Sequence, residues 1–599
     1  MKKISSGSIV IYFLFATLYY IWVLLTYRNI IHMDMVNIVG TKVKDLCEHN
    51  LRIVDFIYEP LFPCTTSLIF TFLNVIFFHL NTIVETVVGT AFLIAAGYIY
   101  FSKINAFLIS KRQKMFFALL IGFITFGFHK WEASFTSFFS FAVFFDLCIC
   151  FFNYFFVVRY VGMDQYERRW YHLPILALSN LLVIVEAPAY FYAYNVSILI
   201  LLMLIRWFEI IRIDKKRWNS VVTLYVFLLL LTVGITSYLS HNPDFSQYAS
   251  KLSVGGFIGV FFQKPLWVIQ FYLIANSGAY WGEAFNRIGL RTVFGAVILV
   301  AYGMAIYRVI RSKDKRLLVP VALIFYNIIS CGFITMGRYY FASIEYGASS
   351  RYTAFNLSGA LGLVTIIFFY ILEEKRKSRR IISSLLLTGI ILANINVDKR
   401  QLIISSARIS SFKQMETSLL TGEDLDILQA PRTAALRAIE VLKKYNLNVY
   451  YENAAKMNGA PMDLARLKKV NLISGTAAFT ELTKIGFYDN ENGISWTNGK
   501  AAIFLNNPIE IADSLFVQLN TYMPPICEKV NPKLSIVDED NKEYLPVNAT
   551  RKGGEFYYYF YLNKRISLKR INLSGETVDA SPDLRLLSFP FASLEMRVK

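Results

Sequence analysis

The chain has 599 residues, of which 55% are hydrophobic and 16% aromatic, and its mean hydropathy is +0.44. Soluble domains contain roughly 45 to 50% apolar residues, so this composition excludes an ordinary soluble protein and indicates a polytopic membrane protein. The net charge of +19 would also suit a nucleic-acid-binding protein. However, the basic residues gather in short connections between apolar segments, where positive charge sets the orientation of membrane helices, so we expect no nucleic-acid partner.

The first apolar segment, residues 8–26, follows Met1-Lys2-Lys3 and is longer than the core of a signal peptide. No cleavage pattern of small residues follows it. We therefore predict a retained membrane anchor with a cytoplasmic N-terminus.

Apolar runs long enough to cross a membrane as helices recur up to residue 397. We predict eleven spans, at residues 8–26, 83–102, 115–128, 137–158, 173–189, 191–211, 218–240, 286–310, 317–336, 353–372 and 381–397. Connections after the even-numbered spans are strongly basic, as in KRQK (111–114) and EEKRKSRR (373–380), whereas those after odd-numbered spans are not. The positive-inside rule then places the C-terminus on the extracytoplasmic side.

Two further apolar stretches, residues 62–80 and 265–281, would invert this charge pattern if each crossed the membrane once. We predict helices that lie in the outer leaflet or re-enter it; the alternative is a pair of ordinary spans. The first outer loop also holds Cys47 and Cys64, which could form a disulfide on that side or remain free thiols.

Beyond residue 397 charged and turn-forming residues occur throughout. Residues 398–490 are predicted as a mixed helical segment that includes an amphipathic helix at 429–447. Residues 491–599 contain short alternating runs between clusters of Asn, Gly, Pro and Asp, which predict a β-sandwich. The expected fold is an α-helical polytopic membrane domain (1–397), with re-entrant or interfacial outer helices, followed by an extracytoplasmic α+β tail.

Aromatic residues in this tail have two interpretations. Trp496 and the run FYYYFY (556–561) could bind sugar by stacking, or they could pack the sandwich core, which the alternation favours. The stretch DLRLLSFPFASLEM (583–596) resembles the terminal strand pair of β-sandwich modules in bacterial glycosyltransferases, with Asp583 and Arg585 as a structural pair.

Ionisable residues gather on the predicted outer side, and such residues near membrane depth indicate function. Asp34 follows the first span between Met33 and Met35, an apolar frame that would desolvate a carboxylate and suit a general base of raised pKa. His32 and His49 could orient Asp34 or share its proton, or they could be structural. A solvated rim would explain part of the remaining charge.

Arg338 and Arg351 bracket the small-residue loop GRYYFASIEYGASSRY (337–352). Guanidinium groups beside tyrosines suit a phosphate or pyrophosphate at the membrane surface. The alternative is that these arginines snorkel toward lipid headgroups.

Four features resemble the GT-C class of integral-membrane glycosyltransferases: the acid after the first span, EHNLRI (48–53), HKWE (129–132), and GR…SSRY before a late span. The resemblance covers residues 8–397 and is greatest to bacterial enzymes that use polyprenyl-phosphate sugars to decorate O-antigen or other surface glycans. It implies an inverting transfer of a glucose-like hexose to a glycan or lipid-linked hydroxyl at the outer face of the bacterial inner membrane.

The resemblance also assigns roles to residues. It implies that Asp34 is the catalytic base and that Arg351, Arg338 and Tyr352 bind the donor phosphate. The residues implied to bind substrate are Glu48, His49, Asn50, Arg52, Lys130, Trp131 and Glu132. We expect His32, beside Asp34, to bind substrate as well. Met35 stands where aminoarabinose and protein mannosyl transferases have a second acid, and a hard cation wants several oxygens, so we expect neither a metal nor another cofactor.

Two other functions are open to this sequence. One is a transporter or flippase of a lipid-linked sugar with an outer receptor domain, and the other is a non-catalytic assembly scaffold. Transporters often show internal repeats and polar groups at mid-membrane, whereas here we find no convincing repeat and little mid-membrane polarity beyond Glu186-Ala-Pro. This favours chemistry at one membrane surface.

Overall fold

The computed structural model describes residues 6–162, 171–241, 254–282, 287–338, 344–422, 424–451, 469–473, 482–491, 494–511, 514–521, 530–552, 555–562, 564–579, 586–588 and 590–598. The chain divides into two compact units, here called the membrane unit (Met1–Ser406) and the C-terminal unit (Ala407–Lys599). The domain limits expected at 397 and 490 stay predictions.

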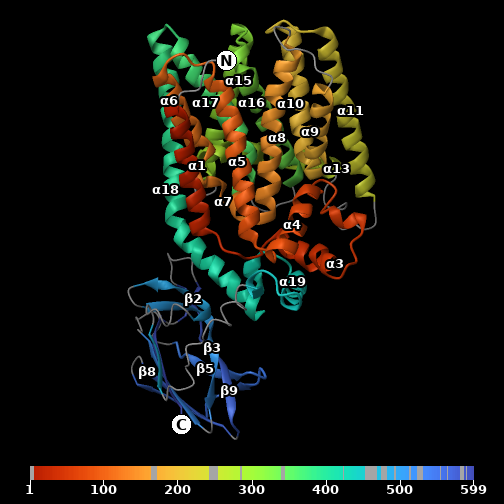
Figure 1. The fold of residues 1–599 in the computed structure, drawn as a ribbon. Helices are drawn as coiled ribbons and strands as arrows, with labels where there is room; N and C mark the ends of the chain where they lie inside the picture. Colours follow the sequence, from red (N-terminus) through yellow and green to blue (C-terminus); the bar gives the residue numbers. More distant parts are fainter. Residues whose placement is uncertain are drawn as a thin grey trace. The chain divides into compact units, whose positions relative to one another are not determined.

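Long apolar helices build the membrane unit, standing side by side in Figure 1. Within the described residues, nine are long and apolar enough to cross a membrane, or up to ten if one bent pair counts as a span. The nine are α1 (Ser6–Thr26), α5 (Thr82–Asn105), α8 (Ser137–Val161), α10 (Pro188–Trp207), α11 (Lys215–Ser240), α15 (Ile288–Ser312), α16 (Leu318–Arg338), α17 (Ser350–Glu373) and α18 (Lys377–Thr421).

Two of the eleven expected spans form shorter helices of 15 residues, α6 (Lys111–Thr125) and α9 (His172–Glu186). Helix α6 begins before its apolar run because Ser110 and Gln113 cap each other reciprocally. Helix α9 ends early because Pro188 stands at the first turn of α10, a position that starts a new helix.

The two stretches expected not to cross the membrane differ from ordinary spans. Helix α4 (Thr65–Phe78) has 14 residues. Helix α13 (Val254–Gln263) precedes α14 (Pro265–Trp281), and residues 257–263 and 265–278 are bent by 110° to one another, as in a broken span or a re-entrant loop. Cys47 and Cys64 are not joined by a disulfide.

Glu186, the acid expected at mid-membrane, lies at the beginning of α4. Its Oε2 accepts the backbone N–H groups of Thr66 (2.8 Å) and Ser67 (3.2 Å), and its Oε1 accepts the Ser67 hydroxyl. A carboxylate here satisfies N–H groups that the first turn of a helix leaves without a partner. Glu186 therefore ties the end of α9 to α4.

Helix α17 is the central element of the membrane unit. Its residues are buried from Ser350 to Phe369, with Arg351 as the exception. Helix α16 packs closely along α17. Gly362 of α17 permits this approach, because a Cβ atom there would lie only 2.4 Å from the carbonyl oxygen of Pro320 in α16. A central, tightly packed helix gives its first turn a fixed position.

Helix α18 continues through residue 397, where the last span was expected to end, and reaches Thr421 in a single helix of 45 residues. The sequence between Gly389 and Gly422 contains neither glycine nor proline. Gly422 follows the helix with a φ of +74°, the left-handed conformation common after a helix C-terminus.

The C-terminal unit begins with the last residues of α18 and continues with η7 (Leu425–Leu428) and α19 (Arg432–Lys444), which confirms the expected amphipathic helix. Its strands are β1 (Lys469–Ile473), β2 (Thr483–Glu491), β3 (Ile494–Ile511), β4 (Ser514–Thr521), β5 (Lys533–Asp538), β6 (Glu543–Tyr544), β7 (Asn548–Lys552), β8 (Glu555–Tyr561), β9 (Ile566–Ser574), β10 (Val578–Asp579), β11 (Leu586–Leu587) and β12 (Pro590–Val598).

These strands form one ten-stranded antiparallel sheet and a separate two-stranded one. The expected β-sandwich stays a prediction. The main order is β6-β5-β9-β3-β12-β4-β8-β7, with β1 paired to β12 and β2 to β3. Strand β3 has 18 residues, and its register with β9 shifts between Phe504 and Ile509. Such an irregularity bends a strand. Strand β3 can therefore pair with β9 as well as with β2 and β12 in one continuous sheet.

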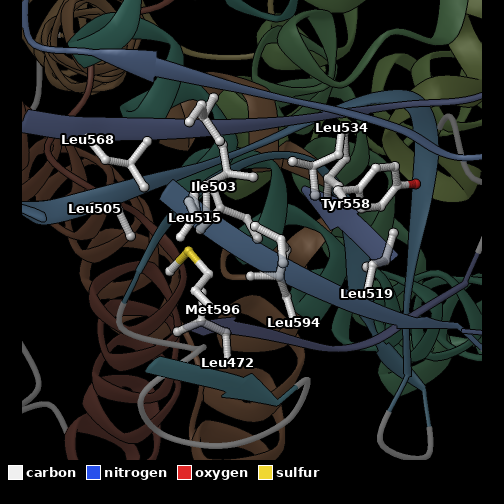
Figure 2. Packing of buried hydrophobic residues seen from close by; sticks show 14 of the residues in the cluster. Leu472, Ile503, Leu505, Leu515, Leu519, Leu534, Tyr558, Leu568, Leu594 and Met596 are labelled. Atoms are coloured by element: carbon white, nitrogen blue, oxygen red, sulfur yellow. The ribbon is translucent and has the colours of Figure 1, made fainter. Parts of the chain in front are cut away.

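One hydrophobic core is shared by most strands of the main sheet. Figure 2 shows Ile503 of β3, Leu515 of β4, Leu568 of β9 and Leu594 of β12 around it. In β8, Phe556, Tyr558 and Phe560 belong to this core, whereas Tyr559 and Tyr561 are 48% and 69% exposed. The side chain of Trp496, and residues Asp583 and Arg585, lie outside the described residues.

Substitution of Leu594 by Ala should destabilise the C-terminal unit by about 2 to 5 kcal/mol, because it leaves a cavity at a fully buried position of the core. Thermal unfolding of the full-length protein would detect this as an earlier transition. The matched control is Tyr561→Ala, which removes a larger but exposed side chain from the same sheet. An equal loss in both variants would contradict the assignment of the core.

Candidate functional site

The connection after α1 is fixed to the helix bundle at its beginning. Asn29 Oδ1 accepts the backbone N–H of Thr82 (2.8 Å) and the Thr82 hydroxyl (3.1 Å) at the start of α5. The chain then passes through buried Ile30 to Met33 and enters α2 (Asp34–Ile38). These bonds hold the segment that carries His32 and Asp34.

Asp34 is the first residue of α2 and is partly buried, between buried Met33 and Met35. The Tyr58 hydroxyl donates a hydrogen bond to its Oδ1 at 3.1 Å. The other oxygen, Oδ2, has no hydrogen-bond partner among the described residues. Asp34 therefore has one oriented oxygen and one available acceptor.

The second connection, η3 (Phe128–Lys130) and α7 (Trp131–Phe135), places Glu132 against the first turn of α17. The Ser349 and Ser350 hydroxyls donate to Glu132 Oε2 at 3.0 and 2.8 Å. Burial alone would raise the pKa of Glu132, but Arg351 and the two hydroxyls outweigh it and lower that pKa. Glu132 is therefore an ionised carboxylate at neutral pH.

Arg351 pairs with Glu132 along one edge of its guanidinium group. Its Nε donates to Glu132 Oε1 at 2.7 Å, and its Nη2 also pairs with that oxygen. Nη2 lies 3.7 Å from the Met33 sulfur, next to Asp34 in the chain. Nη1 has no hydrogen-bond partner among the described residues, and the side chain is 33% exposed. One edge is fixed, and donors remain for an anion.

Asp34 interacts electrostatically with Arg351. His32 belongs to the same group of charges, because Glu132 and Arg351 both act on it. Burial lowers the pKa of His32 to about 4, with smaller opposed contributions from these two neighbours. The imidazole is thus neutral at neutral pH and adds no charge to the site.

Arg338, the last residue of α16, contacts Tyr352 in the first turn of α17. Its Nε donates to the Tyr352 hydroxyl at 2.6 Å, and its guanidinium carbon lies 5.8 Å from the centre of that ring. Tyr352 also interacts electrostatically with Arg351 and Glu132. The structure therefore brings together His32, Asp34, Glu132, Arg338, Arg351 and Tyr352, all expected at the site.

Lys130 is fully buried, unlike an outer-loop lysine exposed to substrate. Its Nζ donates to the Gly127 carbonyl at 2.8 Å and lies 5.9 Å from the centre of the Tyr19 ring. Burial lowers the pKa of Lys130 to about 7, partly offset by Asp398. Asp398 Oδ1 in turn accepts the Phe128 backbone N–H at 2.7 Å, so this cluster fixes the second connection to α18.

The remaining expected residues lie apart from these contacts. His49 and Asn50 are exposed after α3 (Lys44–Cys47), and Glu48 and Trp131 are partly exposed. Arg52 is exposed and 3.5 Å from buried Asp55. No contact between these side chains and Asp34 or Arg351 is found in the described part of the chain. Their roles in substrate binding stay predictions.

Four residues with clear roles at the site were missed by sequence reasoning: Tyr58, Ser349, Ser350 and Asp398. Tyr58 could have been singled out only by its partner, 24 residues away along the chain. Ser349 and Ser350 directly precede Arg351 in the chain. Their position at the start of a helix, where serine side chains often accept or donate hydrogen bonds, was the signal that could have found them. The described residues contain no group of three or more His, Cys, Asp or Glu placed to hold a metal ion.

No family model and no curated protein matches the chain. Two solved structures of the oligosaccharyltransferase from Archaeoglobus fulgidus are similar to it. The apo form gives a TM-score of 0.38 at 13% identity, covering 71% of this chain and 60% of that chain. The complex with zinc and sulfate gives 0.35 at 12% identity, covering 70% and 57%. This chain thus spans about 60% of the archaeal chain's length.

Substitution of Lys130 by Met should raise the unfolding temperature at pH 7.5 by about 2 to 4 °C, because it removes the cost of burying an amine. Since burial lowers the pKa of this group to about 7, the unfolded state binds more protons between pH 7 and 10, and wild-type stability rises with pH there. The advantage of the variant should therefore shrink toward pH 10. A difference that is independent of pH would contradict this.

Proposed function

We propose that the chain is an inverting glycosyltransferase that moves a hexose from a polyprenyl-phosphate donor to a hydroxyl group of a surface glycan. The observation that carries this is the convergence of Asp34, after the first span, with Arg351, at the start of α17. The resemblance in the loop motifs points to the same class. We place the reaction at the outer face of a bacterial inner membrane, following the positive-inside pattern.

In the proposed reaction Asp34 acts as the general base. Its Oδ2, which has no hydrogen-bond partner among the residues that the structure describes, takes the proton from the acceptor hydroxyl while the acceptor oxygen attacks the anomeric carbon of the sugar. The bond between that carbon and the phosphate oxygen breaks on the opposite side, which inverts the configuration. Polyprenyl phosphate leaves with the electron pair, and the proton stays on Asp34.

Arg351 stabilises the leaving phosphate through the guanidinium donors that Glu132 does not occupy. A guanidinium group held in place before the reaction stabilises developing negative charge without reorganising. Arg338 donates a hydrogen bond to Tyr352, the residue after Arg351, and adds a second positive charge there. The phosphate is already a good leaving group, so a base, a fixed cation and positioning suffice for the chemistry.

Substitution of Asp34 by Asn should lower sugar transfer from a purified polyprenyl-phosphate donor about 10²- to 10⁴-fold, because the amide cannot take the proton. The variant keeps an oxygen that can accept from Tyr58, so folding should be preserved. Asp45→Asn, in the same outer loop, is the matched control and should retain transfer. Undiminished turnover in the Asp34 variant would exclude its role as base, and sugar movement without covalent product would favour a transporter.

Substitution of Tyr58 by Phe should lower kcat about 10- to 150-fold and leave the donor KM nearly unchanged. The change removes one hydrogen bond to a charged group, and such a bond contributes about 1.5 to 3 kcal/mol. Steady-state kinetics with donor and acceptor varied separately would measure this. A changed donor KM with an unchanged kcat would mean that Tyr58 orients the donor instead of Asp34.

A further inference from the structure

Glu132 was expected to bind substrate, but its contacts are directed to the protein. Both of its oxygens already accept hydrogen bonds: Oε1 from Arg351, and Oε2 from Ser349 and Ser350. Its side chain is 8% exposed. A carboxylate this occupied and this buried has little capacity left for a sugar hydroxyl.

The three donors to Glu132 are consecutive residues, 349–351, at the start of the central helix α17. The Glu132 carboxylate on the second connection therefore holds the hydroxyl groups of Ser349 and Ser350 and the guanidinium group of Arg351. The pair joins residues 219 positions apart in the sequence. It thereby holds the Nε and Nη2 edge of Arg351.

We propose that Glu132 is a positioning residue that clamps Arg351 by its Nε and Nη2 edge, so that Nη1 is presented to the donor phosphate. This deepens the proposed function and rests on it for the identity of the anion. The clamp itself involves no covalent step. It requires that the Glu132–Arg351 pair persists when a phosphate binds.

An alternative arrangement gives the opposite result. If the phosphate replaced Glu132 on Arg351, the carboxylate would compete with the donor, and its removal would strengthen binding. The clamp predicts that removal weakens binding, because a released arginine side chain loses its fixed orientation and must be ordered again. The sign of the effect therefore distinguishes a clamp from a competitor.

The test measures binding of a short-chain polyprenyl monophosphate to the purified full-length protein in nanodiscs, with no sugar or acceptor present. Glu132→Gln should raise the Kd about tenfold, because the neutral amide accepts these donors more weakly. Glu132→Asp keeps the charge and should lose about threefold or less. An unchanged or lower Kd for Glu132→Gln would refute the clamp.

The matched control is Glu373→Gln. Glu373 lies at the other end of α17 and pairs with Arg316, so the variant breaks an Arg–Glu pair on the same helix far from the site. Its Kd should equal that of the wild type. If Glu132→Gln does not fold, the double variant Ser349→Ala, Ser350→Ala removes only the hydroxyls that hold Oε2. It should raise the Kd about threefold, and no change would count against the proposal.

A double-mutant cycle separates positioning from general stability. Once Arg351 is replaced by Ala, the Glu132→Gln change should not raise the Kd further, because the group that it positions is gone. Additive losses would overturn the proposal. Weakened phosphate binding without any sugar transfer by the wild type would keep the clamp and reject the glycosyltransferase; transfer with a Kd insensitive to Glu132 would do the reverse.

Discussion

The ion pair between Glu132 and Arg351 is the interaction on which the rest of the site depends. Removing one partner of a buried pair leaves an uncompensated charge, which costs far more than the pair contributes when intact. The pair is supported by two serine hydroxyls and by the packing of α17 in the middle of the membrane unit. The second connection is thus held at one end by Arg351 and at the other by Asp398.

This arrangement explains why charged residues are tolerated here. Polar groups near membrane depth are stable only when their partners are supplied by the protein. The Lys130 amine binds a backbone carbonyl and an aromatic ring, and burial favours the neutral forms of Lys130 and His32. Ionised groups at neutral pH are then concentrated where they pair, around Arg351 and Glu132.

The sequence was informative about residues whose position follows from the end of a span. Asp34 and Arg351 each stand next to such an end, and their residue types alone suggested an acid and an anion site. The partner of Arg351 could not be predicted in this way, since nothing in a single sequence links positions 219 apart. The burial of Lys130 could not be predicted for a related reason, because a short polar loop gives no sign that it folds back into the bundle.

The C-terminal unit shows the same limit in a sheet. Alternation of apolar residues located β4, β5, β8, β9 and β12 and part of β3, and it favoured core packing for the aromatic run of β8. In that run Phe556, Tyr558 and Phe560 are in the core, whereas Tyr559 and Tyr561 are exposed. Whether strands form one sheet or two depends on long-range pairing, and here β3 pairs with β2, β9 and β12. The length of β3 and its shift in register are tertiary features that alternation does not encode.

The formal charges of the site residues explain why a clamped arginine suits the proposed transfer. Arg338 and Arg351 contribute two positive charges, Asp34 and Glu132 two negative ones, and neutral His32 none, so the group is balanced before the donor binds. During transfer one negative charge leaves Asp34, which gains a proton, and one appears on the departing phosphate. The negative charge therefore moves from a carboxylate that Tyr58 orients through its other oxygen toward a guanidinium group whose position does not change. A cation that had to swing into place would have to reorganise in a site of low dielectric, whereas a fixed one stabilises the new charge as it forms.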